Sequence, residues 1–165
     1  DTSVQAQNLR AFGEYKRMLS ARNYAYFGAE YLHDDIADIS YRVTTGPGVG
    51  RYCLKSPARQ FSTEVGVPYI TEKVGETTDD RIALRAAERL EWKPAAGSRI
   101  WESVEYMPST KDFKESLINS EIGAEAAMHT WFNLRVVCQN KYNSEPADDK
   151  QRNDLILIAG FSSKF

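Results

Sequence analysis

The feature that most constrains the fold is a stripe of apolar residues that recurs every three or four positions between Met18 and Ile39. This spacing places side chains on one side of an α-helix. No proline and only one glycine, Gly13, lie between Thr2 and Lys16. The sequence therefore predicts one helix from about Ser3 to about Ser40. Its spine comprises Met18, Ala21, Ala25, Ala29, Leu32, Ile36 and Ile39.

The predicted helix is too long for the domain that carries it. Some 38 residues would form a helix of about 57 Å. A compact domain of 165 residues has a diameter of about 40 Å. We therefore expect the first helical turns to project from the domain or to pack against another molecule.

The rest of the chain is interpreted as a mixture of turns, short helices and strands. We interpret "TTGPGVGRYC" as a turn, "DDRIALRAAERLEW" as a short helix and "RIWESVEYM" as a strand. Ser109 and Asp112 fit a capping box that opens another helical stretch. Near the end, Phe132, Leu134, Val136 and Cys138 of "WFNLRVVCQ" alternate onto one face, and "DLILIAGF" is an apolar run, so the two predict an antiparallel hairpin.

These elements predict an α+β fold in which a long N-terminal α-helix packs on an antiparallel β-sheet. Residues 1–165 would form a single domain, with 1–40 as the helix and 41–165 as an α+β head. A hydrophobic share of 42% and a charged share of 27% are typical of globular proteins. The net charge is −2 with no basic patch, so nucleic acid is not an expected partner.

An acidic cluster in "HDDIAD" raises the question of metal chemistry. Asp34, Asp35 and Asp38 form a DDxxD pattern that looks like the first aspartate-rich motif of isoprenyl diphosphate synthases, which hold magnesium against a diphosphate. That resemblance covers about ten residues, and a second aspartate-rich helix is not evident. We favour the interpretation that these acids are the solvated end of an amphipathic helix. No HExxH, CxxC or GxSxG motif occurs, so we expect no catalytic residue, no metal and no cofactor.

Two cysteines, Cys53 and Cys138, lie far apart in the sequence. They could be two buried thiols, or one disulfide between a central loop and a late strand. Their spacing leaves both possibilities open.

The segment "RMLSARNYAYFGAEYL" resembles the start of the soluble region of type IV minor pilins and pseudopilins, with matches at Arg22, Asn23, Ala25, Ala29 and Glu30. The resemblance implies a non-enzymatic subunit of a cell-surface filament that assembles with other pilin subunits through its helix spine. It also implies a Cys53–Cys138 disulfide. The location would be the periplasm or cell surface, with membrane anchoring by an apolar segment preceding Asp1.

Two other functions compete with this hypothesis. The chain could be a magnesium-dependent enzyme of diphosphate chemistry that uses Asp34, Asp35 and Asp38. It could also be an interaction domain that packs its helix on a large assembly.

Overall fold

The computed structural model describes residues 8–35, 37–129, 132–146 and 151–163, and this part of the chain is built from β-strands without a helix. The strands are β1 (Asn8–Met18), β2 (Asn23–Asp34), β3 (Ile39–Lys55), β4 (Arg59–Gly66), β5 (Tyr69–Val74), β6 (Thr77–Ile82), β7 (Arg85–Trp92), β8 (Ser98–Pro108), β9 (Ser116–Ala127), β10 (Phe132–Asn143) and β11 (Asn153–Ser163). The predicted α+β fold is therefore wrong.

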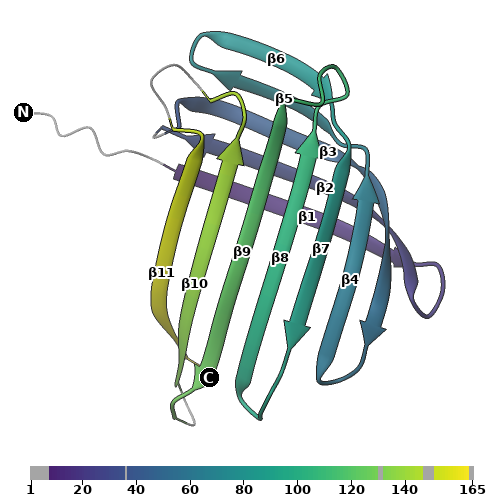
Figure 1. The fold of residues 1–165 in the computed structure, drawn as a ribbon, viewed down its shortest axis with the longest axis vertical. Coiled ribbons are helices and arrows are strands. Elements are labelled where there is room, and N and C mark those ends of the chain that lie inside the picture. The colour runs from purple at the N-terminus through teal and green to yellow at the C-terminus, as the bar shows by residue number, and fades with distance from the viewer. Residues whose placement is uncertain (1–7, 36, 130–131, 147–150, 164–165) are drawn as a thin grey trace, which may run out of the picture.

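All the described strands belong to one antiparallel sheet, which curls into a half-barrel (Figure 1). Its main path runs β1-β2-β3-β4-β7-β8-β9-β10-β11. The long strand β3 pairs with β4 along its second half and with β5 along its first half. Strand β5 also pairs with β6, and β4 also pairs with β7. The β5–β6 hairpin thus extends one end of the half-barrel beyond β4 and β7.

The described residues of the predicted helix spine are divided among three strands and one turn. Ala25, Ala29 and Leu32 lie in β2, Met18 ends β1, and Ile39 begins β3. Ala21 lies in the turn between β1 and β2, and Ile36 is outside the described residues. No helix in the described part of the chain is long and apolar enough to cross a membrane.

Strand β2 shows why the helical prediction failed. Successive side chains in a strand point to opposite faces, and here both faces carry large apolar groups. Tyr24, Tyr26 and Leu32 are buried on one face, whereas Phe27 and Tyr31 are exposed on the other. Apolar residues on both faces do not alternate in sequence, so a subset of them matches helical spacing by chance.

Two other helical predictions and one turn prediction are also wrong. The segment "DDRIALRAAERLEW" forms β6 and β7, and "TTGPGVGRYC" lies within β3. Ser109 and Asp112 lie in the connection before β9, where Asp112 Oδ1 accepts a hydrogen bond from the Lys114 backbone N–H. The predicted strand in "RIWESVEYM" is confirmed as part of β8, and the predicted C-terminal hairpin is confirmed as β10 paired with β11.

The sheet curls toward the face that carries Tyr24 and Tyr26, which we call the inner face. Tyr24 on β2 donates a hydrogen bond to Glu64 on β4, across the intervening β3. Arg85 on β7 donates to Tyr26 on β2, across both β3 and β4. Side chains can reach past intervening strands in this way only on the concave side of a sheet. At the β5–β6 end, a small apolar core of Ile70, Ala83, Met107 and Leu117 fills this side.

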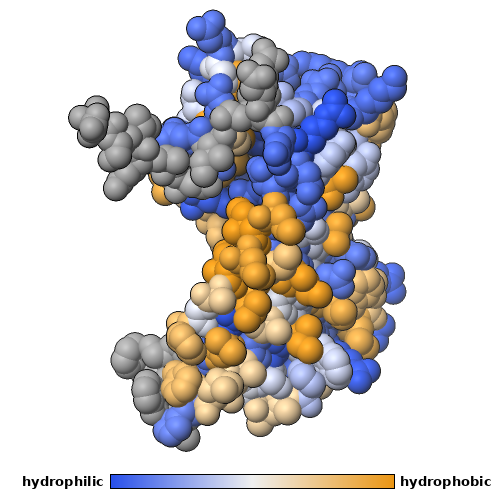
Figure 2. Space-filling model, turned by 60° about the vertical axis from the view of Figure 1, so that its left-hand side comes forward, coloured by the Kyte–Doolittle hydropathy of each residue, from blue (hydrophilic) through white to orange (hydrophobic). Residues whose placement is uncertain are grey.

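The convex side, which we call the outer face, is rich in exposed apolar residues. Cross-strand partners point to the same side of a sheet, so the register assigns each residue to a face. Figure 2, which turns the β10–β11 side forward, shows an apolar band between more hydrophilic regions. Outer-face residues with exposed apolar side chains include Phe27, Tyr31, Val49, Val65, Leu90, Tyr106, Ile122, Val136 and Leu157.

Candidate functional site

Two tyrosine rings pack directly against glycine backbone on the inner face of β3. Gly48 and Gly50 lie opposite Tyr26 and Tyr24 in the β2–β3 register. A Cβ atom at Gly48 would lie 2.2 Å from Tyr26 Cζ, and one at Gly50 would lie 2.4 Å from Tyr24 Cζ. Each ring therefore lies directly over a glycine, in space that any other side chain would fill. The glycines of "TTGPGVG" serve this close approach and not a turn.

Glu64 on β4 is the centre of a polar network beside these rings. Its carboxylate accepts hydrogen bonds from the Tyr24 hydroxyl at 2.7 Å, Lys16 Nζ at 3.0 Å and Arg85 Nη1 at 2.8 Å. Burial by itself would raise the pKa of Glu64, but these donors outweigh it and lower the pKa to about 2. Burial and the hydrogen bond to Glu64 raise the pKa of Tyr24 to about 12. The network thus holds an ionised carboxylate against a neutral phenol.

Arg85 extends the network along the sheet. Its Nη1 donates to the Tyr26 hydroxyl at 2.6 Å, and its Nε donates to Glu105 on β8. Glu105 also accepts from Asn119 Nδ2 on β9 at 3.1 Å. Side chains from β1, β2, β4, β7, β8 and β9 are therefore joined across the concave side of the sheet.

A second polar cluster surrounds Trp101 on β8. Its indole Nε1–H donates to Glu121, while the guanidinium carbons of Arg99 and Arg135 lie 4.7 Å and 5.0 Å from its ring centroid. The ring packs over Gly123, where a Cβ atom would lie 2.1 Å from Trp101 Cζ2. Burial by itself would raise the pKa of Glu121, but the hydrogen bond from Trp101 contributes to a net lowering. The buried indole thus lies between its hydrogen-bond acceptor and two cationic side chains that remain at least partly exposed.

A third cluster joins Arg42 on β3, Glu72 on β5 and Arg81 on β6. The Glu72 carboxylate bridges both guanidinium groups, and Arg81 also pairs with Asp79 at 3.0 Å. Glu72 is buried, and paired burial of this kind offsets the cost of removing its charge from water.

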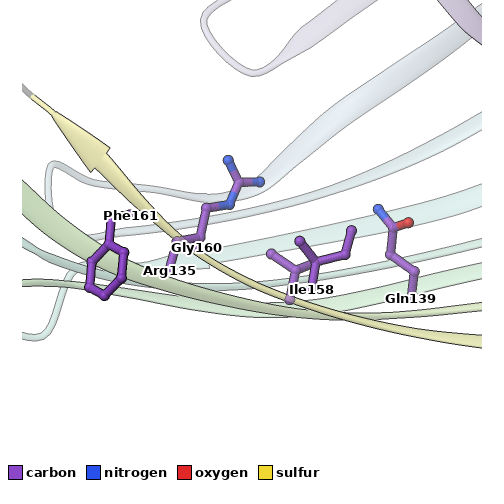
Figure 3. A pocket seen from close by; sticks show the side chains of 6 residues that line it. Arg135, Gln139, Ile158, Gly160 and Phe161 are labelled. Carbon is purple, nitrogen blue, oxygen red and sulfur yellow. The ribbon is translucent and has the colours of Figure 1, made fainter.

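The inner face also contains a shallow hollow at the free edge of the sheet (Figure 3). It measures about 290 Å³ and is lined by Arg135, Val137, Gln139, Ile158, Gly160 and Phe161. In Figure 3 the Arg135 and Phe161 side chains extend to opposite sides of the sheet. The hollow is small and open, and it brings no nucleophile and base together.

Comparison with family models shows that residues 1–165 match the family described as "Protein of unknown function, DUF481". The chain belongs to the DUF481 family. No curated protein and no solved structure matches the chain.

The predicted membership of the type IV minor pilins and pseudopilins is wrong, and the DUF481 match replaces it. The residues that suggested a pilin lie in a turn and a strand. Arg22 is in the turn before β2, and Asn23, Ala25, Ala29 and Glu30 lie along β2. A pilin requires a long N-terminal helix at this position, whereas this DUF481 chain forms a β-hairpin from β1 and β2.

The aspartates of the DDxxD pattern lie at the connection between β2 and β3, not on a helix. Asp34 Oδ1 accepts a hydrogen bond from the Ala37 backbone N–H at 3.2 Å, and Asp35 lies 3.2 Å from His33 Nε2. Asp38 has a positive φ of 55°, which suits a tight turn. Within the described ranges, no group of three or more His, Cys, Asp or Glu side chains could hold a metal ion.

The predicted Cys53–Cys138 disulfide is not present, since both thiols are free. Cys53 lies on β3 and Cys138 on β10, which are five strand steps apart along the main path. At about 4.8 Å per step they are separated by about 24 Å along the sheet. A disulfide requires Cα atoms within about 7 Å, so this fold excludes the bond within one chain.

Sequence reasoning missed the inner-face residues, although the sequence contained a signal for them. In β9, Glu121, Gly123 and Glu125 alternate with the less polar Ile122 and Ala124. This period of two predicts a strand with one polar face. A polar face of this kind is visible in sequence, but its partners on β8 and β10 are not.

Proposed function

We propose that this DUF481 chain forms part of the wall of a membrane-spanning barrel of antiparallel strands. Its outer face would contact lipid and its inner face would line a polar interior. The observation that carries the proposal is the separation of side chains between the two faces. Exposed apolar residues gather on the convex side, and the ion pairs of Glu64 and Arg85 are on the concave side.

Strand β8 illustrates this separation at single-residue spacing. Arg99, Trp101 and Glu105 point inward and take part in the polar networks. Ile100 and Tyr106 point outward and are 38% and 40% exposed. In a water-soluble sheet with one solvated face we would expect the exposed convex face to be polar. The reversed arrangement, apolar outside and polar inside, is typical of strands that cross a membrane.

Strand length supports the same function. A strand that crosses the hydrocarbon core needs about 9–11 residues when it is tilted. Strands β1, β8 and β11 each contain 11 residues, and β2, β9 and β10 each contain 12. The antiparallel pairing also satisfies the backbone polar groups of every interior strand, as a lipid environment requires.

Two acids on the central strands β7 and β8 interrupt the apolar outer face. Glu102 lies opposite Leu90 and Ile122, and Glu88 lies opposite Val104. A carboxylate facing hydrocarbon is destabilising by an amount that depends on its depth. Replacing either acid with an apolar residue should therefore stabilise the protein if the outer face contacts lipid, and should not stabilise it if that face contacts water.

Quenching of tryptophan fluorescence by brominated lipids tests the proposal. One variant keeps Trp101 as its only tryptophan, with Trp92 and Trp131 replaced by phenylalanine. The second replaces all three and carries Ile122→Trp, which places the indole on the outer face of β9. In vesicles we expect brominated acyl chains to quench the outer indole several-fold more than Trp101. Equal, weak quenching of both, with both open to a water-soluble quencher, would exclude a lipid-facing outer surface.

The filament-subunit function and the expectation of no enzymatic activity stay predictions. The same holds for the predicted pilin partners and for the periplasmic or cell-surface location. The long helix through which filament assembly was expected is absent from the described residues. We therefore favour the membrane-wall function, because the separation of apolar and charged side chains between the two faces of the sheet supports it.

A further inference from the structure

Arg135 on β10 is an exposed, inward-pointing arginine without an ionic partner. Among the described residues it makes no ion pair and no hydrogen bond. Its guanidinium lies over the ring of Trp101 instead, with the guanidinium carbon 5.0 Å from the ring centroid. Stacking of this kind occupies the flat face of a guanidinium and leaves its N–H groups free to donate. Arg135 therefore presents unused hydrogen-bond donors while it is held against Trp101.

The two glutamates nearest to Arg135 are already engaged by other donors. Both Glu121 and Glu125 point inward from β9, next to Arg135 on β10. Each of their four carboxylate oxygens accepts one hydrogen bond, and the donors are Trp101, Gln139, Asn133 and Arg99. These acids therefore leave the N–H groups of Arg135 available to a ligand.

The groups around Trp101 leave one positive charge in excess. Three inward arginines interact electrostatically with the two glutamates, and they are Arg89, Arg99 and Arg135. The remaining acid, Glu91, lies opposite Trp101 in the β7–β8 register and is paired with Lys93 at 3.1 Å. A ligand with a single negative charge would balance this part of the inner face, whereas a phosphate ester with nearly two charges would overcompensate it.

The hollow at the β11 edge lies beside this guanidinium. Val137 and Ile158 supply its apolar surface, and Gly160 leaves its space open, since a Cβ atom there would have no neighbour within 4 Å. In Figure 3 the Arg135 and Gln139 side chains rise from the same side of the sheet, with Ile158 between them. A volume of about 290 Å³ is near the lower limit for ligand sites in proteins. The hollow therefore offers space for a small ligand with an apolar body and a charged head.

We propose that this hollow binds a free medium-chain carboxylate such as decanoate. The carboxylate accepts hydrogen bonds from the Arg135 guanidinium, whose planar fork matches carboxylate geometry, and the alkyl chain lies along Val137 and Ile158. The positive charge selects an anion, and the apolar surface selects an anion that carries a hydrocarbon chain. This inference goes beyond the membrane-wall function and does not depend on it, because the hollow is on the inner face.

Quenching of tryptophan fluorescence by ω-bromodecanoate tests the proposal in the full-length variant that keeps Trp101 as its only tryptophan. Because Arg135 contacts Trp101, a bromine bound in the hollow lies close to the indole ring. With the protein in vesicles of unbrominated lipid, at a mildly alkaline pH that ionises the acid, we expect quenching that saturates. The uncharged ω-bromodecanol should reach half-saturation at a roughly tenfold higher concentration, the loss expected when a hydrogen bond between charged groups is removed.

Two substitutions and two matched controls locate the ligand, with circular dichroism to verify that each variant is folded. Arg135→Gln should raise the half-saturating concentration of ω-bromodecanoate roughly tenfold, and Gly160→Val, which fills the hollow, should abolish the saturable quenching. Lys141→Gln removes an inward positive charge from the same strand outside the hollow. Gly28→Val adds the same side chain at another open glycine of the inner face. Neither control should change the quenching.

Several outcomes would overturn the proposal. They include equal half-saturation for the acid and the alcohol, or values that Arg135→Gln and Gly160→Val leave unchanged. Absence of quenching at any concentration would indicate that another segment or a second copy covers the hollow. Quenching of Trp101 by brominated phospholipid, if Gly160→Val removed it, would identify a membrane lipid as the ligand in place of a free carboxylate. None of these results depends on the outer indole of Ile122→Trp, so failure of this inference is distinguishable from failure of the membrane-wall function.

Discussion

Replacement of Gly123 by alanine tests the packing of the inner face most directly. The new Cβ atom would lie 2.1 Å from Trp101 Cζ2, whereas ordinary contact begins at 3.4 Å. The difference, 3.4 minus 2.1, requires a displacement of about 1.3 Å. Trp101 is 7% exposed, donates to Glu121 and is contacted by two arginines, so it cannot move without weakening these contacts.

The expected loss of stability follows from two terms. Overpacking of a well-packed site costs about 1–3 kcal/mol. A weakened hydrogen bond to a charged group adds up to about 1.5–3 kcal/mol. Because partial relaxation reduces both terms, we expect Gly123→Ala to lower the free energy of unfolding by about 2–4 kcal/mol.

A matched control is available on the inner face of β2. A Cβ atom added at Gly28 would have no neighbouring atom within 4 Å, and Gly28 does not have a positive φ. Gly28→Ala should therefore be neutral, or stabilising by up to about 1 kcal/mol, since alanine restricts the unfolded chain. The comparison separates the clash with Trp101 from the general effect of replacing glycine in a strand.

The assay is denaturant unfolding of lipid- or detergent-bound protein, followed by circular dichroism. Trp101→Ala should remove most of the cost of Gly123→Ala when the two are combined, as expected for residues in contact. If Gly123→Ala and Gly28→Ala differed by less than about 0.5 kcal/mol, the ring would not lie over Gly123. The assignment of inner and outer faces on β8 and β9 would then be incorrect.

Three further predictions concern charge and thiols. The pKa of Glu64 is about 2 in the folded protein against 4.5 for an unperturbed glutamate, so its stabilisation is present above pH 4.5 and is lost as the pH falls toward 2. Glu64→Gln should therefore flatten the dependence of unfolding free energy on pH in that window, and an unchanged slope would contradict the network. Glu102→Leu should stabilise the protein in bilayers by about 1 kcal/mol, measured by unfolding in vesicles; no gain would indicate that the acid faces water. Thiol titration of unreduced, denatured protein should detect both Cys53 and Cys138, while detection of neither would indicate a bond that this fold excludes.

The sequence predicted strands best where one face differs from the other. In β10, Phe132, Leu134, Val136 and Cys138 alternate onto one face, and the positions between them are polar except for Val137; the predicted hairpin with β11 is confirmed. The same rule failed in β2 because Tyr24 and Tyr26 fill the inner face while Phe27 and Tyr31 fill the outer one. With large apolar groups on both faces, periodicity no longer distinguishes a strand from a helix.

The glycines of β3 were misinterpreted for a related reason. Glycine with proline in a short segment usually marks a turn, and "TTGPGVG" has both. The function of Gly48 and Gly50 depends on Tyr26 and Tyr24, which lie more than twenty positions earlier in the sequence. Glycine in a strand can also mark a site of close approach, but the group that approaches is known only from the register.

The candidate site could not be predicted because its members are joined across strands. Glu64 pairs with Arg85 from β7, Tyr24 from β2 and Lys16 from β1, and no motif spans these positions. The curl of the sheet brings them together, and curl is not encoded by any short segment.

The alternation of inward and outward side chains along each strand also explains why the average composition did not reveal the apolar outer face. A strand presents only every second residue to one side, so its outer face never forms a continuous apolar run in sequence. In β8 the inward Trp101 and Glu105, which belong to the inner networks, lie in the sequence between the outward Ile100, Val104 and Tyr106. A search for some 18 consecutive apolar residues tests only for spanning helices. For a chain of this kind the informative quantity is the hydropathy of alternate residues, and on β8 through β11 that quantity favours an outer face in contact with lipid.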